Sequence, residues 1–203
     1  MVLPGREQFR SAILQYVELP GARLLRALRF TPNGTTLLGF AVTVVAACLV
    51  SFGWLWAGGI VFLSGSALDL MDGALARLTG TDSSFGALLD SVFDRLGEAA
   101  LFLGLAVHAI QGDFSDNHRL FFVIVILLAL IFSQGVSYLR ARGEGLGVFT
   151  RAGVMTRPER VLLLGVGLLA GQIEWFLLAI AVVSCVTLFQ RLFTIRGMLN
   201  KDT

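Results

Sequence analysis

Long runs of apolar residues, separated by short polar stretches, dominate the chain. We predict six helices from them, at about residues 35–56, 58–78, 85–110, 120–139, 158–170 and 174–193, each boundary within about three residues. All but the fifth run are close to the ~20 residues that cross a bilayer. The fifth is short, and it could begin upstream at Thr156 with Pro158 in its first turn, where proline is tolerated. The pattern therefore predicts an all-α polytopic membrane protein with six transmembrane helices.

The composition agrees with a membrane protein. Hydrophobic residues make up 56% of the 203 residues, charged residues only 15%, and the mean hydropathy is +0.79. Soluble domains have roughly 25% charged residues, so the composition indicates a membrane protein rather than a water-soluble fold. Cys48 and Cys185 lie inside apolar runs and are interpreted as core residues rather than a disulfide or a metal site. The first thirty residues are too polar for a signal peptide.

The segment 1–30 alternates leucines, isoleucine and valine with arginines, and it contains Pro20-Gly21. This pattern predicts an amphipathic juxtamembrane helix, broken at Pro20-Gly21, that lies in the headgroup plane of an anionic leaflet. The alternative is a cytosolic cap packed on the bundle. We therefore divide the chain into an interfacial region, 1–30, and a six-helix transmembrane catalytic domain, 31–203.

The distribution of basic residues predicts the orientation. All basic residues except Lys201 are arginines, and most fall at the termini and in every second link between helices. The links at 56–59, 111–119 and 171–174 contain a single arginine, Arg119. The positive-inside rule then places both termini in the cytosol, and Trp54, Trp56 and Trp175 form an aromatic belt at the opposite boundary.

Carboxylates interrupt the second and third apolar runs. A charge near mid-bilayer costs about 2.5–3.5 kcal/mol, so a group of them indicates a functional site. Asp69, Asp72, Gly73, Ala76 and Arg77 share one face of the second helix at 100° per residue. A second stripe, spaced by four residues on the third helix, consists of Gly86, Asp90 and Asp94. Because the polar link 79–84 is short, the two helices are predicted to be antiparallel neighbours whose carboxylates converge.

Four adjacent carboxylates cannot all remain ionised without cations, since like charges raise one another's pKa. Hard oxygen ligands select Mg²⁺, Mn²⁺ or Ca²⁺, and the stretch has no His or Cys to hold zinc. A two-metal carboxylate site indicates phosphoryl chemistry. Two alternatives remain: buried ion pairs, in which Arg77 and Arg95 neutralise the aspartates, and an ion-coupled membrane transporter.

The run from Asp69 to Arg77, followed after eight residues by the run from Gly86 to Asp94, resembles the signature of the CDP-alcohol phosphatidyltransferase family. All eight signature positions are filled at the family's spacing. The resemblance implies transfer of the phosphatidyl group of CDP-diacylglycerol to a hydroxyl acceptor, with release of CMP, at a cytosol-facing cavity. It also implies two divalent cations, Mg²⁺ or Mn²⁺, and a homodimer.

The same resemblance implies roles for individual residues. Asp69, Asp72 and Asp90 would ligate metal, and Asp94 would complete the metal site and act as the catalytic base. Arg77 would contact the diphosphate, Gly73 and Gly86 would lie near the nucleotide, and Asp69 and Ala76 would also belong to the CDP-lipid site. A short motif before the first spanning helix touches the cytidine in the family. Its equivalent here is Pro32, Asn33 and Thr36, which are also typical helix-start residues.

Arginines at the predicted cytosolic ends of the fourth, fifth and sixth helices indicate which kind of acceptor the enzyme uses. Arg140, Arg157 and Arg191 are predicted to bind a phosphate on it, although they could simply be positive-inside anchors. Their surroundings resemble the prokaryotic phosphatidylinositol-phosphate synthases, with Arg140 where a lysine is common, which implies inositol phosphate as acceptor in a prokaryotic cell membrane. Glycerol 3-phosphate is the alternative. No pattern indicates nucleic-acid binding.

Overall fold

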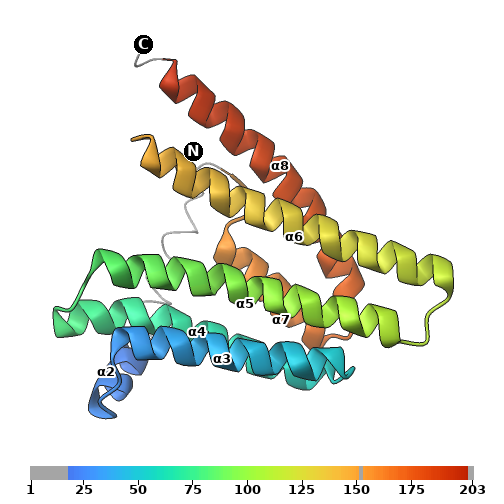
Figure 1. The fold of residues 1–203 in the computed structure, drawn as a ribbon, viewed down its shortest axis with the longest axis horizontal. Coiled ribbons are helices and arrows are strands. Elements are labelled where there is room, and N and C mark those ends of the chain that lie inside the picture. Colours follow the sequence, from blue (N-terminus) through green and yellow to red (C-terminus); the bar gives the residue numbers. More distant parts are fainter. Residues whose placement is uncertain (1–17, 151–152, 201–203) are drawn as a thin grey trace. The chain divides into compact units, whose positions relative to one another are not determined.

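The computed structural model describes residues 18–150 and 153–200, and helices are the only regular secondary structure within these ranges (Figure 1). In chain order the helices are α2 (Leu19–Ala27), α3 (Pro32–Ser51), α4 (Leu55–Thr79), α5 (Ser84–Gln111), α6 (Asp116–Gly145), α7 (Arg157–Leu169) and α8 (Ile173–Leu199). The all-α prediction is confirmed, and each of the six predicted apolar helices has a counterpart in α3–α8.

The end of the first apolar helix was predicted wrongly. α3 stops at Ser51 instead of continuing to residue 56, and Trp56 belongs to the first turns of α4. Gly53 has φ +82°, a left-handed conformation that ends helices and that glycine adopts without strain. The link is therefore 52–54, and the apolar residues within and after it, Phe52, Trp54 and Trp56, concealed the turn. α6 and α8 also run six residues beyond their predicted C-terminal ends.

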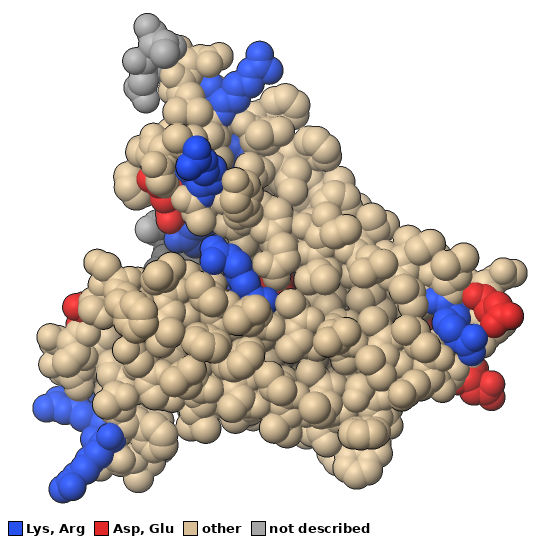
Figure 2. Space-filling model, in the orientation of Figure 1, with Lys and Arg blue, Asp and Glu red and all other residues tan. Residues whose placement is uncertain are grey.

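Four of these helices are long and apolar enough to cross a membrane: α3, α4, α6 and α8. α5 has 28 residues but carries Asp90, Asp94, Arg95 and Glu98, and α7 has only 13 residues. The protein is thus a membrane protein with four helices that meet both criteria. Most of the face shown in Figure 2 is uncharged, as expected for helices surrounded by lipid.

Helix α2 lies in the described part of the predicted interfacial region. It begins at Leu19, so that Pro20 lies in its first turn, where proline is tolerated. Ala22 and Leu25 are buried in a cluster with Ala74 and Leu75 of α4. The preceding residues, 1–17, with the rest of the predicted interfacial helix, lie outside the described part of the chain.

The chain divides into two compact units, and α3, α4 and α5 each contribute to both. The first unit comprises residues 1–46 and 61–100. Within it, α3 and α4 approach closely at two glycines: a methyl group on Gly39 would lie 3.1 Å from the carbonyl oxygen of Gly65, and one on Gly65 would lie 3.0 Å from that of Gly39. The rings of Phe40 on α3 and Phe93 on α5 have centroids 4.9 Å apart. Small residues at such contacts bring helix backbones together in membranes.

The second unit comprises residues 47–60 and 101–203. Its core is the packing of α6 and α7 on α8. The Arg191 side chain of α8 donates a 2.8 Å hydrogen bond from Nη1 to the carbonyl oxygen of Val136 on α6. Gly167 of α7 leaves room for Phe176 of α8, whose Cβ would be 2.9 Å from an added methyl group. This unit holds all three arginines that the sequence assigned to the acceptor, Arg140, Arg157 and Arg191.

Candidate metal centre and active site

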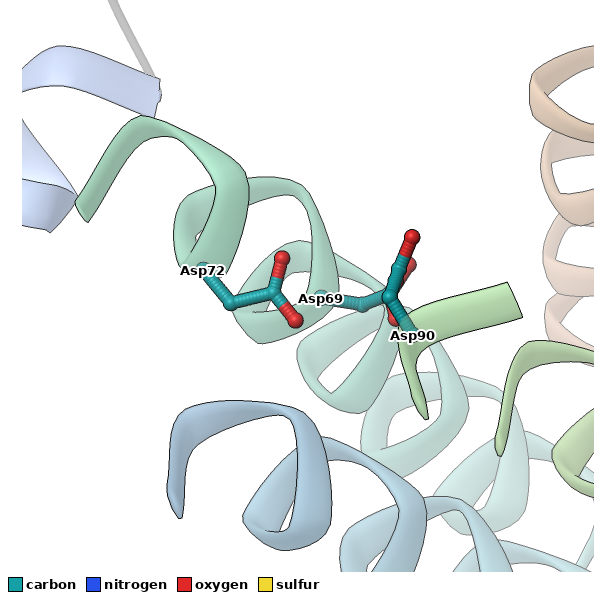
Figure 3. A group of neighbouring side chains, drawn as sticks. All are labelled: Asp69, Asp72 and Asp90. Atoms are coloured by element: carbon teal, nitrogen blue, oxygen red, sulfur yellow. The ribbon is translucent and has the colours of Figure 1, made fainter. Parts of the chain in front are cut away.

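Three aspartates from two helices come together in the first unit. Asp69 and Asp72 lie one turn apart on α4, and Asp90 lies near the start of α5 (Figure 3). One carboxylate oxygen from each lies within 4.8 Å of those of the other two. Asp72 is buried and the other two are half-buried. Oxygens this close, from three anionic side chains, can hold a hard divalent cation such as Mg²⁺ or Mn²⁺.

Thr36 of α3 orients the most buried of these carboxylates. Its hydroxyl lies 2.5 Å from Oδ2 of Asp72, to which it donates a hydrogen bond, and both side chains are buried. Thr36 and Asp72 are 36 positions apart in the sequence. A donor of this kind fixes the direction in which a ligand oxygen points, as outer-shell partners of metal ligands do. The sequence had assigned Thr36 to the nucleotide and gave no sign of this contact.

Two signature glycines create space next to polar side chains. An added Cβ on Gly73 would lie 3.4 Å from Nη1 of Arg77, and one on Gly86 would lie 3.3 Å from Oδ1 of Asn33. The start of α3, the end of α4 and the start of α5 therefore bring Asn33, Gly73 and Gly86 into the same unit as the aspartates. Pro32 is the first residue of α3, and Ala76 lies half-buried one turn after Asp72.

Arg77 and Arg95, which the sequence offered as neutralising partners of the aspartates, also contact other groups. Nη2 of Arg77 lies 3.5 Å from Oε2 of Glu18, and this is the only ion pair of Arg77 among the described residues. Nη1 of Arg95 donates to the backbone oxygen of Ser91, one turn earlier on α5.

Asp94 lies one turn beyond Asp90 on α5 and is half-buried. Within the described parts of the chain, the close group consists of Asp69, Asp72 and Asp90, and Asp94 is not a member of it. Four-residue spacing still places Asp94 on the same side of α5 as Asp90. Its function as base and as fourth ligand stays a prediction.

The acceptor arginines all lie in the second unit, on three helices, but their environments differ. Arg140 on α6 is exposed and pairs with Glu144 one turn later, with 2.9 Å between Nε and Oε1. Arg157 is the first residue of α7, and it is half-buried. Arg191 on α8 is only 3% exposed. A mere membrane anchor has no reason to be buried, so the burial of Arg191 favours a function inside the protein.

Sequence analysis assigned no role to Arg160, which follows Arg157 in the same run and is 1% exposed. Its Nη2 lies 3.3 Å from the Ser137 hydroxyl of α6, next to the Val136 carbonyl that receives Arg191. Arg160, Leu164 and Leu168 are all buried on α7 at four-residue spacing. That periodicity was visible in the sequence and could have identified Arg160 as an inward-facing charge.

The sequence and structure were compared with known proteins. Residues 29–195 match the model of the CDP-alcohol phosphatidyltransferase family. The phosphatidylinositol phosphate synthase of Mycolicibacterium smegmatis is 37% identical over 193 residues, which cover 89% of this chain and 85% of the relative. The archaetidylinositol phosphate synthase of Pyrococcus horikoshii is 34% identical, over 95% of this chain and 97% of the relative.

The comparison with solved structures points to the same kind of protein as the sequence comparison. Two crystal structures of the phosphatidylinositol phosphate synthase of Mycobacterium tuberculosis superpose with TM-scores of 0.79 and 0.77 at 33% identity, each over 88% of this chain and over 88% and 93% of theirs. The first contains manganese and citrate, and the second contains CDP-DAG.

Fold and site together define a membrane-embedded enzyme with an acidic centre carried on two adjoining helices. The chain belongs to the CDP-alcohol phosphatidyltransferase family. It is therefore a phosphatidyltransferase of phospholipid biosynthesis, and the ion-coupled transporter is set aside.

Proposed function

We propose that this enzyme transfers the phosphatidyl group of CDP-diacylglycerol to inositol phosphate and releases CMP. The observation that most directly supports this reaction is the group of three carboxylates, whose oxygens lie within 4.8 Å of one another. The acceptor is supported by the relatives, which are inositol phosphate lipid synthases from bacteria and an archaeon. The buried Arg191 also supports a phosphorylated acceptor, since guanidinium groups bind phosphate with charge-assisted hydrogen bonds.

In this proposal Asp69, Asp72 and Asp90, completed by Asp94, hold two divalent cations. When bound, such ions offset the charge of the diphosphate and of the leaving CMP. Thr36 keeps the Asp72 carboxylate turned towards the site. Arg77 binds the diphosphate, and Pro32, Asn33, Gly73, Ala76 and Gly86 accommodate the nucleotide.

The reaction at the acceptor requires a base for its hydroxyl group and side chains that bind its phosphate. Asp94 takes the proton from an acceptor hydroxyl while the hydroxyl oxygen attacks the β-phosphorus of CDP-diacylglycerol. The new P–O bond forms as the bond to the CMP oxygen breaks, so the products are the phosphatidylated acceptor and CMP. Arg140, Arg157 and Arg191 orient the acceptor through its phosphate.

We extend the proposal to the topology. The helices α3–α8 form six transmembrane segments, and both termini and the active site face the cytosol. Residues 1–30 form the interfacial region and residues 31–203 the catalytic domain. The protein acts as a homodimer in a prokaryotic cell membrane.

The test is CMP release by the purified protein in lipid, supplied with CDP-diacylglycerol and a panel of alcohols. We expect release with inositol phosphate, little with free inositol, and none in excess EDTA. Asp69→Asn, Asp72→Asn and Asp90→Asn should each abolish release, whereas Asp82→Asn, in the exposed link between α4 and α5, should not. Preference for glycerol 3-phosphate would refute the acceptor but preserve the reaction. Release that survives thorough chelation would refute the metal mechanism.

A further inference from the structure

A groove whose lining includes none of the aspartates or the acceptor arginines runs between the C-terminal ends of α6 and α8. Its volume is about 300 Å³. Most of its lining is apolar: Leu139, Leu146, Leu192, Ile195 and Leu199. The helices come close along its floor because Gly143 has no side chain, and a methyl group there would lie 3.1 Å from Cδ1 of Ile195.

The groove opens to the surroundings of the protein. Leu146 and Leu192 are 47% and 44% exposed. In a protein whose helices lie in a bilayer, leucines exposed beside a groove meet acyl chains, and a narrow apolar channel between helices fits one chain better than it fits water.

Two arginines flank this apolar lining, Arg142 on α6 and Arg196 on α8. Both are exposed, and neither forms an ion pair or side-chain hydrogen bond with another described residue. Arg140, two residues before Arg142, is instead paired with Glu144. The groove thus combines an apolar channel with two positive charges that no described carboxylate offsets.

We propose that this groove binds one anionic phospholipid of the surrounding leaflet, with an acyl chain along the leucines and the phosphate between Arg142 and Arg196. Guanidinium groups form charge-assisted hydrogen bonds with phosphate oxygens. A zwitterionic lipid carries its own cation, which the two arginines repel, so charge selects the anionic class. The inference rests on the protein lying in a membrane and is independent of the acceptor.

Lipid binding is measured directly by native mass spectrometry of the full chain in detergent, titrated with phosphatidylglycerol or phosphatidylcholine. We expect one phosphatidylglycerol to remain bound at concentrations where phosphatidylcholine does not. Each Arg→Gln change should weaken this binding roughly 5-fold, and the double variant Arg142→Gln/Arg196→Gln about 25-fold. Leu199→Gln should weaken it without changing the charge.

The matched control is Arg23→Gln/Arg26→Gln, which removes the same charge from the exposed side of α2. It should leave the bound phosphatidylglycerol in place. Both double variants should release CMP with an unchanged KM for CDP-diacylglycerol, which separates this site from the substrate site.

Three results would overturn the proposal. Equal loss of lipid in both double variants would mean that net charge alone attracts it. Displacement of the lipid by inorganic phosphate would mean that the arginines hold a free anion. A change from dimer to monomer in Arg142→Gln/Arg196→Gln, with lipid binding intact, would mean that a second copy of the chain covers the groove.

Discussion

At the scale of single residues, the hydroxyl of Thr36 is the most informative contact, because it connects α3 to the carboxylate group. Thr36→Val keeps the shape of the side chain but removes the donor to Asp72. Loss of an outer-shell partner lowers metal affinity about 10–100-fold. The Mg²⁺ concentration for half-maximal CMP release should rise by that factor, and Thr36→Ser should restore it.

The neighbouring Thr35→Val is the control for this change. Thr35 is also buried, but its hydroxyl donates to the backbone oxygen of Thr31 within the same segment. It should leave the Mg²⁺ requirement unchanged. Equal effects of the two substitutions would show that Thr36 supports only the helix.

Glu18 provides a second prediction at this scale. Its side chain is 14% exposed and lies beside the half-exposed guanidinium of Arg77. Exposed pairs contribute at most about 1 kcal/mol, which is roughly 5-fold in affinity. Glu18→Gln should therefore raise the KM for CDP-diacylglycerol by up to about 5-fold with little change in kcat. In an Arg77→Ala background the same substitution should have no effect, and a further increase there would contradict the positioning of Arg77 by Glu18.

At the scale of helices, the close approach of α3 and α4 is set by Gly39 and Gly65. Gly65→Ala places a methyl group 2.9 Å from Oγ1 of Thr43 and 3.0 Å from the carbonyl oxygen of Gly39. Overpacking of this kind typically costs about 1–3 kcal/mol. Thermal unfolding in detergent should occur several degrees lower, and CMP release should fall because Thr36 and Asp72 lie on the same two helices. Gly197→Ala on α8, with open space around it, should change neither.

How far the sequence predicts this molecule is clearest at the same scale. Regular apolar runs located α3–α8, and the spacing of Asp69, Asp72 and Asp90 identified the acidic site, because both signals repeat along a helix. The end of α3 was missed because a single left-handed glycine, Gly53, decided it. The bond of Thr36 to Asp72 and the pair of Glu18 with Arg77 join residues 36 and 59 positions apart, and no local pattern encodes such pairs.

At the scale of the whole molecule, the proposed substrates depend on different units. The residues assigned to CDP-diacylglycerol lie in the first, and those assigned to the acceptor phosphate lie in the second. Arg157→Ala should therefore raise the KM for inositol phosphate while leaving that for CDP-diacylglycerol nearly unchanged. Losing one charged partner at a desolvated site costs about 2–5 kcal/mol, or from tens to thousands in affinity.

Arg191→Ala should have the same kinetic signature and should also lower the unfolding temperature, because the Val136 carbonyl loses its donor. The control for both is Arg26→Ala, on the exposed side of α2. If these arginines were only membrane anchors, less of the Arg157→Ala, Arg191→Ala and Arg26→Ala proteins would be inserted into the membrane. The KM values of the inserted enzyme would then remain those of the wild type.

The brevity of α7 has a consequence for the bilayer itself. Its 13 residues span about 20 Å at 1.5 Å per residue, whereas the hydrocarbon core is ~30 Å thick. As the fifth proposed span, α7 creates a hydrophobic mismatch, and lipid headgroups and water are drawn inward around it. This local thinning shortens the path by which a charged, water-soluble acceptor reaches the arginines at the start of α7. A thin bilayer already matches the length of α7 and does not need to deform around it. The enzyme should therefore turn over faster in short-chain lipids than in long-chain ones.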